Sequence, residues 1–477
     1  MPDQPAFPIV QIHSERDLLL APYRHAVARL QHALVDPGDE SALKAAALRG
    51  AEQARVTAWD AAFATLGLRW ASTGATSVTD PFLAAFDASG FVPATLELST
   101  GGQAPLEQGQ ARIAAPLFAL AEWELFKLRG NRQRLEHAFG LLKADFDYRE
   151  HQVRRRNGLL SGSPGAYNLH ATGRFMLGGR VVPSLAGGAN WIDASCMYAL
   201  NARVLAEVAR ALNRKEDAGE LEWVFRDVAA KINARMWHED DGWYYDLDEH
   251  GEPLAMKTLA SVWAVWSGVA PRSSIERMAK RLSDPTQFER AHPWCTVAAG
   301  EGDYRRRDGM PVGVARADFN LLVGESLAAG HLHAAAFKGT EQHLARVAKV
   351  LKDSGEVYLA YDPDRDSPAP LGDGSSGSDS PLALALCIQN TLGGLFGLRP
   401  HGQRGELEIT PMLEDRHVIE NIPFAYGLVN LEVGAADKSG ARRRIDVMCD
   451  VPFRLRVRDG DRSSVQEVQP GMHTLHG

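Results

Sequence analysis

Amphipathic helical patterns recur along this chain from about residue 15 to residue 400, and this repetition constrains the fold more than any other feature. Between Leu221 and Met236, apolar residues return at steps of three and four, which places them on one face of a helix. Comparable patterns predict helices in these further segments: Leu18 to Leu34, Ala42 to Leu66, Ile113 to Leu128, Leu135 to Phe146, Ala194 to Leu212, Ile275 to Leu282, Phe319 to Leu332, Glu341 to Leu351 and Leu382 to Leu395. Loops rich in Gly, Pro and aromatic residues separate them, as in stacked repeats of paired helices. We therefore predict an all-α fold for residues 1–402, a closed double ring of about a dozen helices known as an (α/α)6 toroid.

The pattern changes after about Gly402, where polar and apolar residues begin to alternate. Alternation with a period of two is typical of strands that bury one face. It occurs in four segments: Glu406 to Thr410, Leu428 to Val433, Arg443 to Met448 and Phe453 to Val457. We therefore predict that residues 403–477 form a small antiparallel β appendage packed on the toroid.

Charge and composition limit the partners of the chain. The formal net charge of −8 argues against binding to nucleic acid or to an anionic membrane. No apolar run is long enough to cross a bilayer, and residues 1–5 lack the basic and apolar regions of a secretory signal. We therefore expect a cytoplasmic protein that binds neither nucleic acid nor a membrane, with its oligomeric state left open.

The cysteines and histidines give no sign of a metal site. Cys196, Cys295, Cys387 and Cys449 lie far apart in the sequence, so free, buried thiols are expected. The pair His331 and His333 has no carboxylate close to it in the sequence. We therefore predict no metal and no cofactor.

The segment from Trp237 to Gly251 combines aromatic residues with acids. Asp240-Asp241-Gly242 is a stop and turn signal after the helix that ends near Met236. Trp243-Tyr244-Tyr245 is typical of a short strand, and a second turn follows at Asp248 to Gly251. Such a hairpin places aromatic faces and carboxylates at a helix end, as sugar-binding sites require, but a hairpin that only caps the helix fits equally well.

Several motifs follow one another in an order typical of a known family. They are Trp59-Asp-Ala-Ala-Phe63, Ser89-Gly-Phe-Val-Pro93, Trp191-Ile-Asp-Ala-Ser195, Trp237 to Asp248, Lys257-Thr258, Asp284-Pro285, His292-Pro293 and the ending Pro470 to Leu475. Through them, nearly the whole chain resembles the mannosylglycerate-hydrolase-like branch of glycoside hydrolase family 63, whose wider relatives include the trehalases. The resemblance implies the (α/α)6 fold and a sugar or glycoside-like small molecule as substrate.

The resemblance also implies an inverting glycosidase. Such an enzyme has one carboxylic acid that protonates the leaving oxygen and one carboxylate that activates water, roughly 6.5–9.5 Å apart. Both carboxyls are replaced in this chain. Tyr167 stands where the family has the acid, and no Asp or Glu occurs between Asn157 and Asn190. Leu359 stands where the family has the Glu that acts as the general base.

Neighbouring residues could take over the missing functions. We predict Tyr167, His170 and Asp318 as catalytic residues, because Tyr and His can form an acid–base pair and Asp318 can replace the acid. The base could be one of four acids: Asp353, Glu356, Asp362 and Asp379. The predicted substrate-binding residues supply rings, amides and charges to the same pocket: Trp59, Asp60, Phe63, Asn168, Arg174, Trp191, Asp193, His292, Trp294, Arg316, Tyr358 and Tyr361.

Structural roles compete with several of these assignments. Asp60 and Asp193 could cap helices, and Arg316 with Asp318 could form an ordinary surface pair. Three functional hypotheses stay open. The chain is a carbohydrate-active enzyme with altered catalytic residues, a lyase, isomerase or cyclase on the same scaffold that uses Tyr167 and His170 as acid and base, or a binding protein without catalysis.

Overall fold

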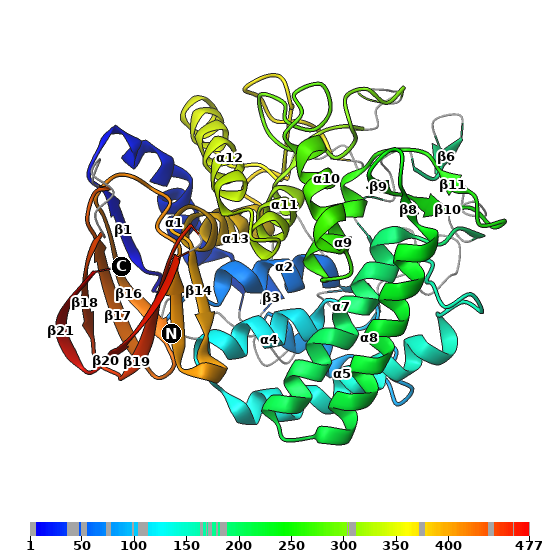
Figure 1. Cartoon of the computed structure of the whole chain (residues 1–477), viewed down its shortest axis with the longest axis horizontal. Coiled ribbons are helices and arrows are strands. Elements are labelled where there is room, and N and C mark those ends of the chain that lie inside the picture. Colours follow the sequence, from blue (N-terminus) through cyan, green and yellow to red (C-terminus); the bar gives the residue numbers. More distant parts are fainter. Residues whose placement is uncertain are drawn as a thin grey trace.

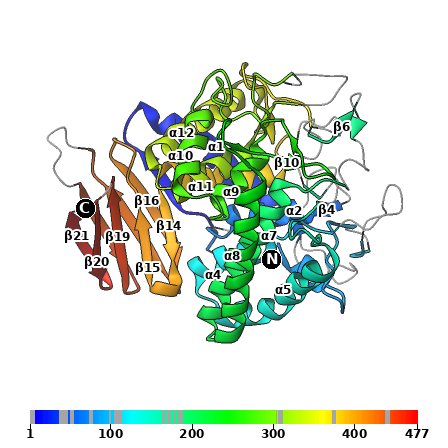
Figure 2. The same ribbon diagram turned by 45° about the vertical axis from the view of Figure 1, so that its right-hand side comes forward.

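The computed structural model of the chain consists of a helical body with a layered β region beside it (Figure 1). The structure describes residues 6–35, 47–48, 55–72, 78–97, 100–103, 113–162, 166–167, 169, 174–177, 180–181, 188–302, 304, 312–371, 377–436, 443–460 and 462–476. Figures 1 and 2 both place the orange and red strands of the C-terminal part on one side of the helices.

An inner ring of helices forms the centre of the helical body. Its described members are α2 (Ala58–Leu68), α4 (Phe118–Arg129), α7 (Ile192–Ala211), α9 (Trp263–Trp266), α11 (Ala317–Ala329) and α13 (Pro381–Gln389). Each packs on the next in this order, and α13 packs on α2, which closes the ring. Every residue of α13 is buried, as expected of a helix that is enclosed on all sides and is apolar all round.

A second layer of helices runs back outside the inner ring. It contains α1 (Ala21–Ala33), the short α3 (Asp80–Ala84), α5 (Arg132–Gln152), α8 (Lys215–Arg235), α10 (Arg272–Leu282) and α12 (His333–Ser354). An outer helix buries one face only, as α8 does with its apolar residues from Leu221 to Ile232. Because inner and outer helices alternate along the chain, the inner helices all run in one direction. This is the (α/α)6 arrangement that the sequence predicted.

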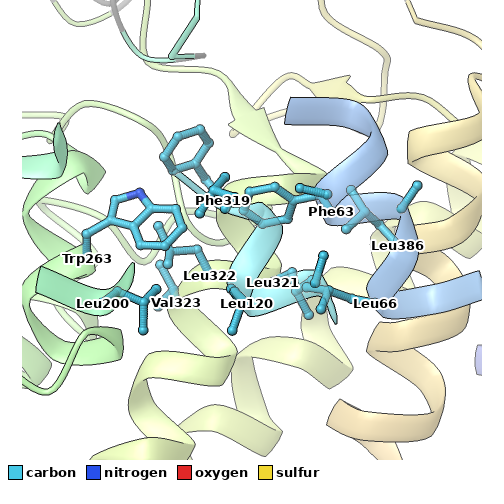
Figure 3. Close-up of a cluster of buried hydrophobic side chains, with 14 of the residues drawn as sticks. Phe63, Leu66, Leu120, Leu200, Trp263, Phe319, Leu321, Leu322, Val323 and Leu386 are labelled. Carbon is cyan, nitrogen blue, oxygen red and sulfur yellow. The ribbon is translucent and has the colours of Figure 1, made fainter. Parts of the chain in front are cut away.

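Apolar side chains fill the middle of the ring, so it is not a pore (Figure 3). They come from every inner helix, and those labelled in Figure 3 are all buried: Phe63, Leu66, Leu120, Leu200, Trp263, Phe319, Leu321, Leu322, Val323 and Leu386. This packed centre separates the end of the ring at the N-termini of the inner helices from the end at their C-termini.

Two sheets form the β region. The first has the order β1-β16-β17-β18-β21 and the second β14-β15-β19-β20. Their strands are β1 (Ile9–Ile12), β14 (Leu398–His401), β15 (Glu406–Ile409), β16 (His417–Phe424), β17 (Gly427–Val433), β18 (Arg444–Cys449), β19 (Phe453–Asp459), β20 (Arg462–Val468) and β21 (Gly471–His476).

The prediction of a purely antiparallel, purely C-terminal appendage is wrong in three respects. Strand β1 comes from the start of the chain and pairs with β16, with Ile9 opposite Glu420. Strands β15 and β19 pair in parallel, with Glu406 opposite Arg454. Strand β14 precedes residue 403. The division of the chain into domains after residue 402 stays a prediction, because both sheets take a strand from the residues before it.

Short strands also decorate the ring, so the chain is not plainly all-α. The paired strands are β4 (Arg55–Thr57) with β5 (Thr95–Glu97), β8 (Trp237–His238) with β9 (Trp243–Tyr244), β10 (Asp246–Leu247) with β11 (Pro253–Leu254), and β12 (Ala315–Arg316) with β13 (Ala360–Tyr361). The pairs β8–β9 and β10–β11 confirm the predicted hairpin. The helix predicted from Ala42 to Leu66 is confirmed only from Ala58 onward and is wrong before it, because β3 (Ala47–Leu48) and β4 come before α2 starts at Ala58.

The cysteines match their prediction, since all four are free and buried. Across the parts of the chain that the structure describes, we find no helix with the length and apolarity that a membrane span needs.

Candidate active site

Three inner helices begin with an acid in the first turn: Asp60 in α2, Asp193 in α7 and Asp318 in α11. Since the inner helices run in one direction, their N-termini surround one mouth of the ring. The positive ends of the helix dipoles meet there, which favours negative charge. This mouth is the candidate active site.

Asp318 is held in a buried cluster with Arg316 and Trp59. Its side chain is 0% exposed. Arg316 donates from Nε to Oδ1 at 3.0 Å and from Nη2 to Oδ2 at 2.8 Å, and Trp59 Nε1 donates to Oδ2 at 3.0 Å. These bonds compensate the cost of burying the charge. Arg316 and Asp318 therefore form a buried pair at the mouth, and the surface pair considered for them is excluded.

Asp60 lies beside this cluster, in the wall of a small pocket between the start of α2 and the start of α13. The pocket is lined by Val56, Thr57, Asp60, Ala61, Val78, Pro81, Phe82, Ser380, Pro381 and Leu382. Its internal volume of about 20 Å³ is room for about one water molecule. Burial and the nearby charge of Asp318 raise the pKa of Asp60 from its ordinary value of 3.8 to about 6. Thr57, not Asp60, caps α2, because its hydroxyl accepts the Asp60 N–H at 3.0 Å.

A second buried cluster joins Arg174 to Asp193 and Asp246. Arg174 donates to the two oxygens of Asp193 at 2.6 and 2.9 Å, and its Nε donates to Asp246 Oδ2 at 2.8 Å. Although burial opposes it, the charges of both acids raise the pKa of Arg174. The guanidinium also lies over Phe175 and Trp191, 4.6 and 5.2 Å from the ring centroids. The cluster fixes Arg174 and Phe175 against the start of α7.

Tyr167 packs edge-on against Trp191, with ring centroids 5.5 Å apart, and is 3% exposed. Burial raises the pKa of its hydroxyl, which keeps the phenol neutral near pH 7. A neutral phenol can donate a proton or a hydrogen bond. The catalytic role of Tyr167 stays a prediction. Its predicted partners Asn168 and His170 lie outside the described residues.

The structure gives the predicted aromatic platform a packing role. Trp59 and Phe63 stack with centroids 4.9 Å apart, and Phe319 stacks on Trp59 at 6.0 Å. Both Trp59 and Phe63 are less than 5% exposed. They therefore contribute to the packed centre of the ring and do not offer a face to a sugar ring.

The other predicted lining residues are also buried. His292 Nε2 lies 2.8 Å from His343 Nδ1, and burial lowers the pKa of both rings. Trp294 Nε1 donates to the Leu282 carbonyl at 3.1 Å. Tyr361 OH accepts the Tyr358 N–H at 2.8 Å. The structure brings none of His292, Trp294, Tyr358 and Tyr361 into the described wall of the Asp60 pocket.

Asp246 is a site residue that the sequence reasoning missed. It accepts from Arg174 and, at 2.8 Å, from the Ile192 N–H at the start of α7. Asp246 therefore caps the start of this helix, where Asp193 Oδ1 also accepts the Ala194 N–H at 2.9 Å. The sequence signal for Asp246 is its place in the aromatic hairpin from Trp237 to Asp248, which brings carboxylates to a helix end.

No group of three or more His, Cys, Asp or Glu side chains that could hold a metal ion occurs among the residues that the structure describes. His331 and His333 have ring centroids 6.1 Å apart and belong to the far end of the ring.

Comparisons with known proteins support the family resemblance. Residues 186–378 match the family model described as the mannosylglycerate hydrolase MGH1-like glycoside hydrolase domain. This segment includes Asp193, Asp246 and Asp318 but neither Asp60 nor Tyr167. An uncharacterised protein of Borreliella burgdorferi is 26% identical over 298 residues, which are 62% of this chain and 60% of that protein.

Solved structures share the fold at low sequence identity. The mannosylglycerate hydrolase of glycoside hydrolase family 63 from Thermus thermophilus, in complex with glucose, is 16% identical, with a TM-score of 0.59 over 77% of this chain and 99% of that chain. A family 78 rhamnosidase of Bacillus sp. GL1 is 13% identical, with a TM-score of 0.69 over 97% of this chain and 43% of that chain. The second likeness therefore includes the β region. The family match over residues 186–378 and these shared folds confirm the resemblance that the motifs predicted, to the mannosylglycerate-hydrolase-like branch of glycoside hydrolase family 63.

Proposed function

We propose that the chain is a carbohydrate-active enzyme with altered catalytic residues, which acts on a sugar or glycoside-like small molecule at the mouth of the ring. The observation that carries the proposal is the carboxyl of Asp60. It has a pKa of about 6 and lies beside a space for about one water molecule. A group whose pKa is near the working pH is suited to proton transfer.

In this proposal Asp60 is the general base that activates water, and Tyr167 donates a proton or a hydrogen bond to the leaving oxygen. Asp318 acts through Asp60 as a positioning residue, since its own carboxylate is completely buried and bonded to Arg316 and Trp59. Trp191 packs on both Tyr167 and the Arg174 guanidinium, and it holds Tyr167 next to the start of α7. The reaction is then hydrolysis with water supplied from the Asp60 pocket.

A product-resolved screen tests the proposal. The first substrates are those named by the structural relatives, which are mannosylglycerate, rhamnosides and trehalose. With an active substrate, kcat/KM should rise with pH through about 6, as Asp60 loses its proton. Asp60→Asn should remove this rising limb of the pH profile and lower turnover roughly 10²–10⁴-fold. Full activity in Asp60→Asn would sink the assignment of the base.

Two further variants separate the roles. Asp318→Asn removes the charge that raises the pKa of Asp60, so the limb should move to lower pH. Tyr167→Phe should lower turnover without moving the limb. If Tyr167→Phe abolishes turnover, Asp60→Asn leaves it intact and the product is unsaturated or isomerised, the alternative reaction that uses Tyr167 and His170 as acid and base replaces hydrolysis.

A further inference from the structure

A larger cavity lies at the opposite end of the ring, where the C-terminal ends of α4, α9 and α11 face strands β14, β15 and β19. We name it the rear cavity. Its volume is about 430 Å³, within the range typical of pockets for small molecules. The apolar side chains shown in Figure 3 fill the centre of the ring, between the C-terminal ends of the inner helices at this cavity and their N-termini at the candidate active site. The rear cavity is therefore an independent place where a ligand can bind.

The charges that line the rear cavity balance one another. Each lining acid lies 2.5 to 3.8 Å from a lining cation in these pairs: Glu124 with Lys127, Glu325 with Arg399, Glu408 with Arg458, and Glu207 with Arg203. Burial lowers the pKa of the lining histidines His333 and His401, the latter to about 4, so both are neutral at pH 7. A charged ligand would disturb this balance, whereas a neutral ligand leaves it intact.

Two residues that line the rear cavity carry buried polar atoms without partners. Arg203 and His333 line the rear cavity, and Arg203 Nε and His333 Nε2 are buried and have no hydrogen-bond partner among the described residues. A small pocket that shares Glu325, His333 and Arg399 with the cavity adds Asn390 Nδ2 and Thr410 Oγ1, which are likewise buried and unpartnered in the described structure. Buried polar groups normally have partners. Hydroxyl groups, which both donate and accept, would suit this mixture.

Two tryptophans complete the lining. Trp123 of α4 and Trp266 of α9 border the rear cavity. Flat aromatic rings can cover the apolar C–H face of a sugar while polar neighbours bind its hydroxyls. From the volume, the charge balance, the unpartnered groups and the rings, we propose that the rear cavity binds a neutral polyhydroxylated molecule, the size of a mono- or disaccharide. This site does not depend on catalysis at the mouth.

Matched sugars of different charge test the proposal. Binding of glucose, glucuronate, glucosamine and trehalose to the full chain is measured by calorimetry and by NMR saturation transfer. Ala329 is exposed and lines the cavity, so Ala329→Phe fills it without removing a buried contact. Arg203→Met removes the unpartnered donor. We expect a neutral sugar to bind, and each variant to raise its Kd at least tenfold, while Asp60→Asn at the mouth leaves the Kd unchanged.

Unfolding midpoints close to that of the wild type show that the variants are folded, and Ala329→Phe keeps the test valid if Arg203→Met does not fold. Tighter binding of glucuronate or glucosamine than of glucose would overturn the neutral class. An unchanged Kd in both rear variants, or loss of binding in Asp60→Asn alone, would place the sugar at the mouth and overturn the rear site. Failure of all neutral sugars to saturate the chain below about 10 mM would also overturn it.

Discussion

Asp60→Asn is expected to stabilise the folded chain at neutral pH. Burial and the charge of Asp318 raise the pKa of Asp60 from 3.8 to about 6 in the folded state, which is a difference of about two units. At about 1.36 kcal/mol per unit, and with a discount for the partial exposure of the side chain, the charged form costs about 2 kcal/mol of stability at pH 7. An Asn of the same shape carries no charge and avoids this cost.

The stability gained by Asp60→Asn should increase as the pH rises. Between pH 3.8 and about 6 the folded chain holds the Asp60 proton more tightly than the unfolded chain does. The contribution of Asp60 to stability therefore falls as the pH rises through this window. Below it, Asp60 is protonated in both states, and Asp60→Asn should change the free energy of unfolding by only a few tenths of a kcal/mol.

Chemical denaturation followed by tryptophan fluorescence at pH 7.5 and pH 3 measures the difference. Glu220→Gln is the matched control, because the Glu220 side chain is 62% exposed, and it should be nearly neutral at both pH values. An equal gain in the free energy of unfolding for Asp60→Asn at both pH values, or a loss at pH 7.5, would refute the argument. Either result would mean that folding does not disfavour the charged form of Asp60.

Two other substitutions test the framework around the site. Arg174→Met leaves the buried carboxylates of Asp193 and Asp246 unpaired, so the free energy of unfolding should fall by about 3–5 kcal/mol, as measured by denaturation; a loss below 1 kcal/mol would mean that the cluster is solvated. Gly90 has a φ of +91°, and a Cβ there would lie 2.2 Å from the Ala144 carbonyl oxygen. Gly90→Ala should therefore lower the thermal midpoint, with a loss of more than 1 kcal/mol, and an unchanged midpoint would contradict this close approach.

The sequence predicts best those helices and strands that bury one face against a single neighbouring element, because the apolar residues of that face recur at a regular spacing. The stripe of apolar residues in α8 exists because α8 buries one face against α7, so its period is visible in the sequence. The hairpin at Trp237 is also local, since turn residues separate its strands. Helix α2 is different. All its residues are buried except Asp60, which is half-buried, so α2 has no apolar stripe beside a polar face. Its start at Ala58 depends on the cap by Thr57.

Long-range pairing explains the remaining errors. Strand β1 pairs with β16, and their residues Ile9 and Glu420 are separated by most of the chain. No periodicity within either segment can encode this pairing. The same holds for the candidate site. The sequence predicts Trp59 and Asp318 as site residues separately. Only the closed ring brings the indole Nε1 of Trp59 to 3.0 Å from the Asp318 carboxylate.

The contrast between Asp60 and Asp318 is the strongest structural reason to place chemistry at the mouth. Asp60 lies in the first turn of α2, where the helix dipole and the Thr57 hydroxyl favour a charged carboxylate. Its pKa is nevertheless raised to about 6, because burial and the neighbouring charge outweigh both effects. Asp318 occupies the equivalent turn of α11 but has Arg316 and Trp59 to compensate its charge. Two neighbouring acids in unlike environments are the arrangement that separates a proton-transfer group from a permanent charge. A ring that served only as a scaffold would gain stability from an apolar residue or an Asn at position 60.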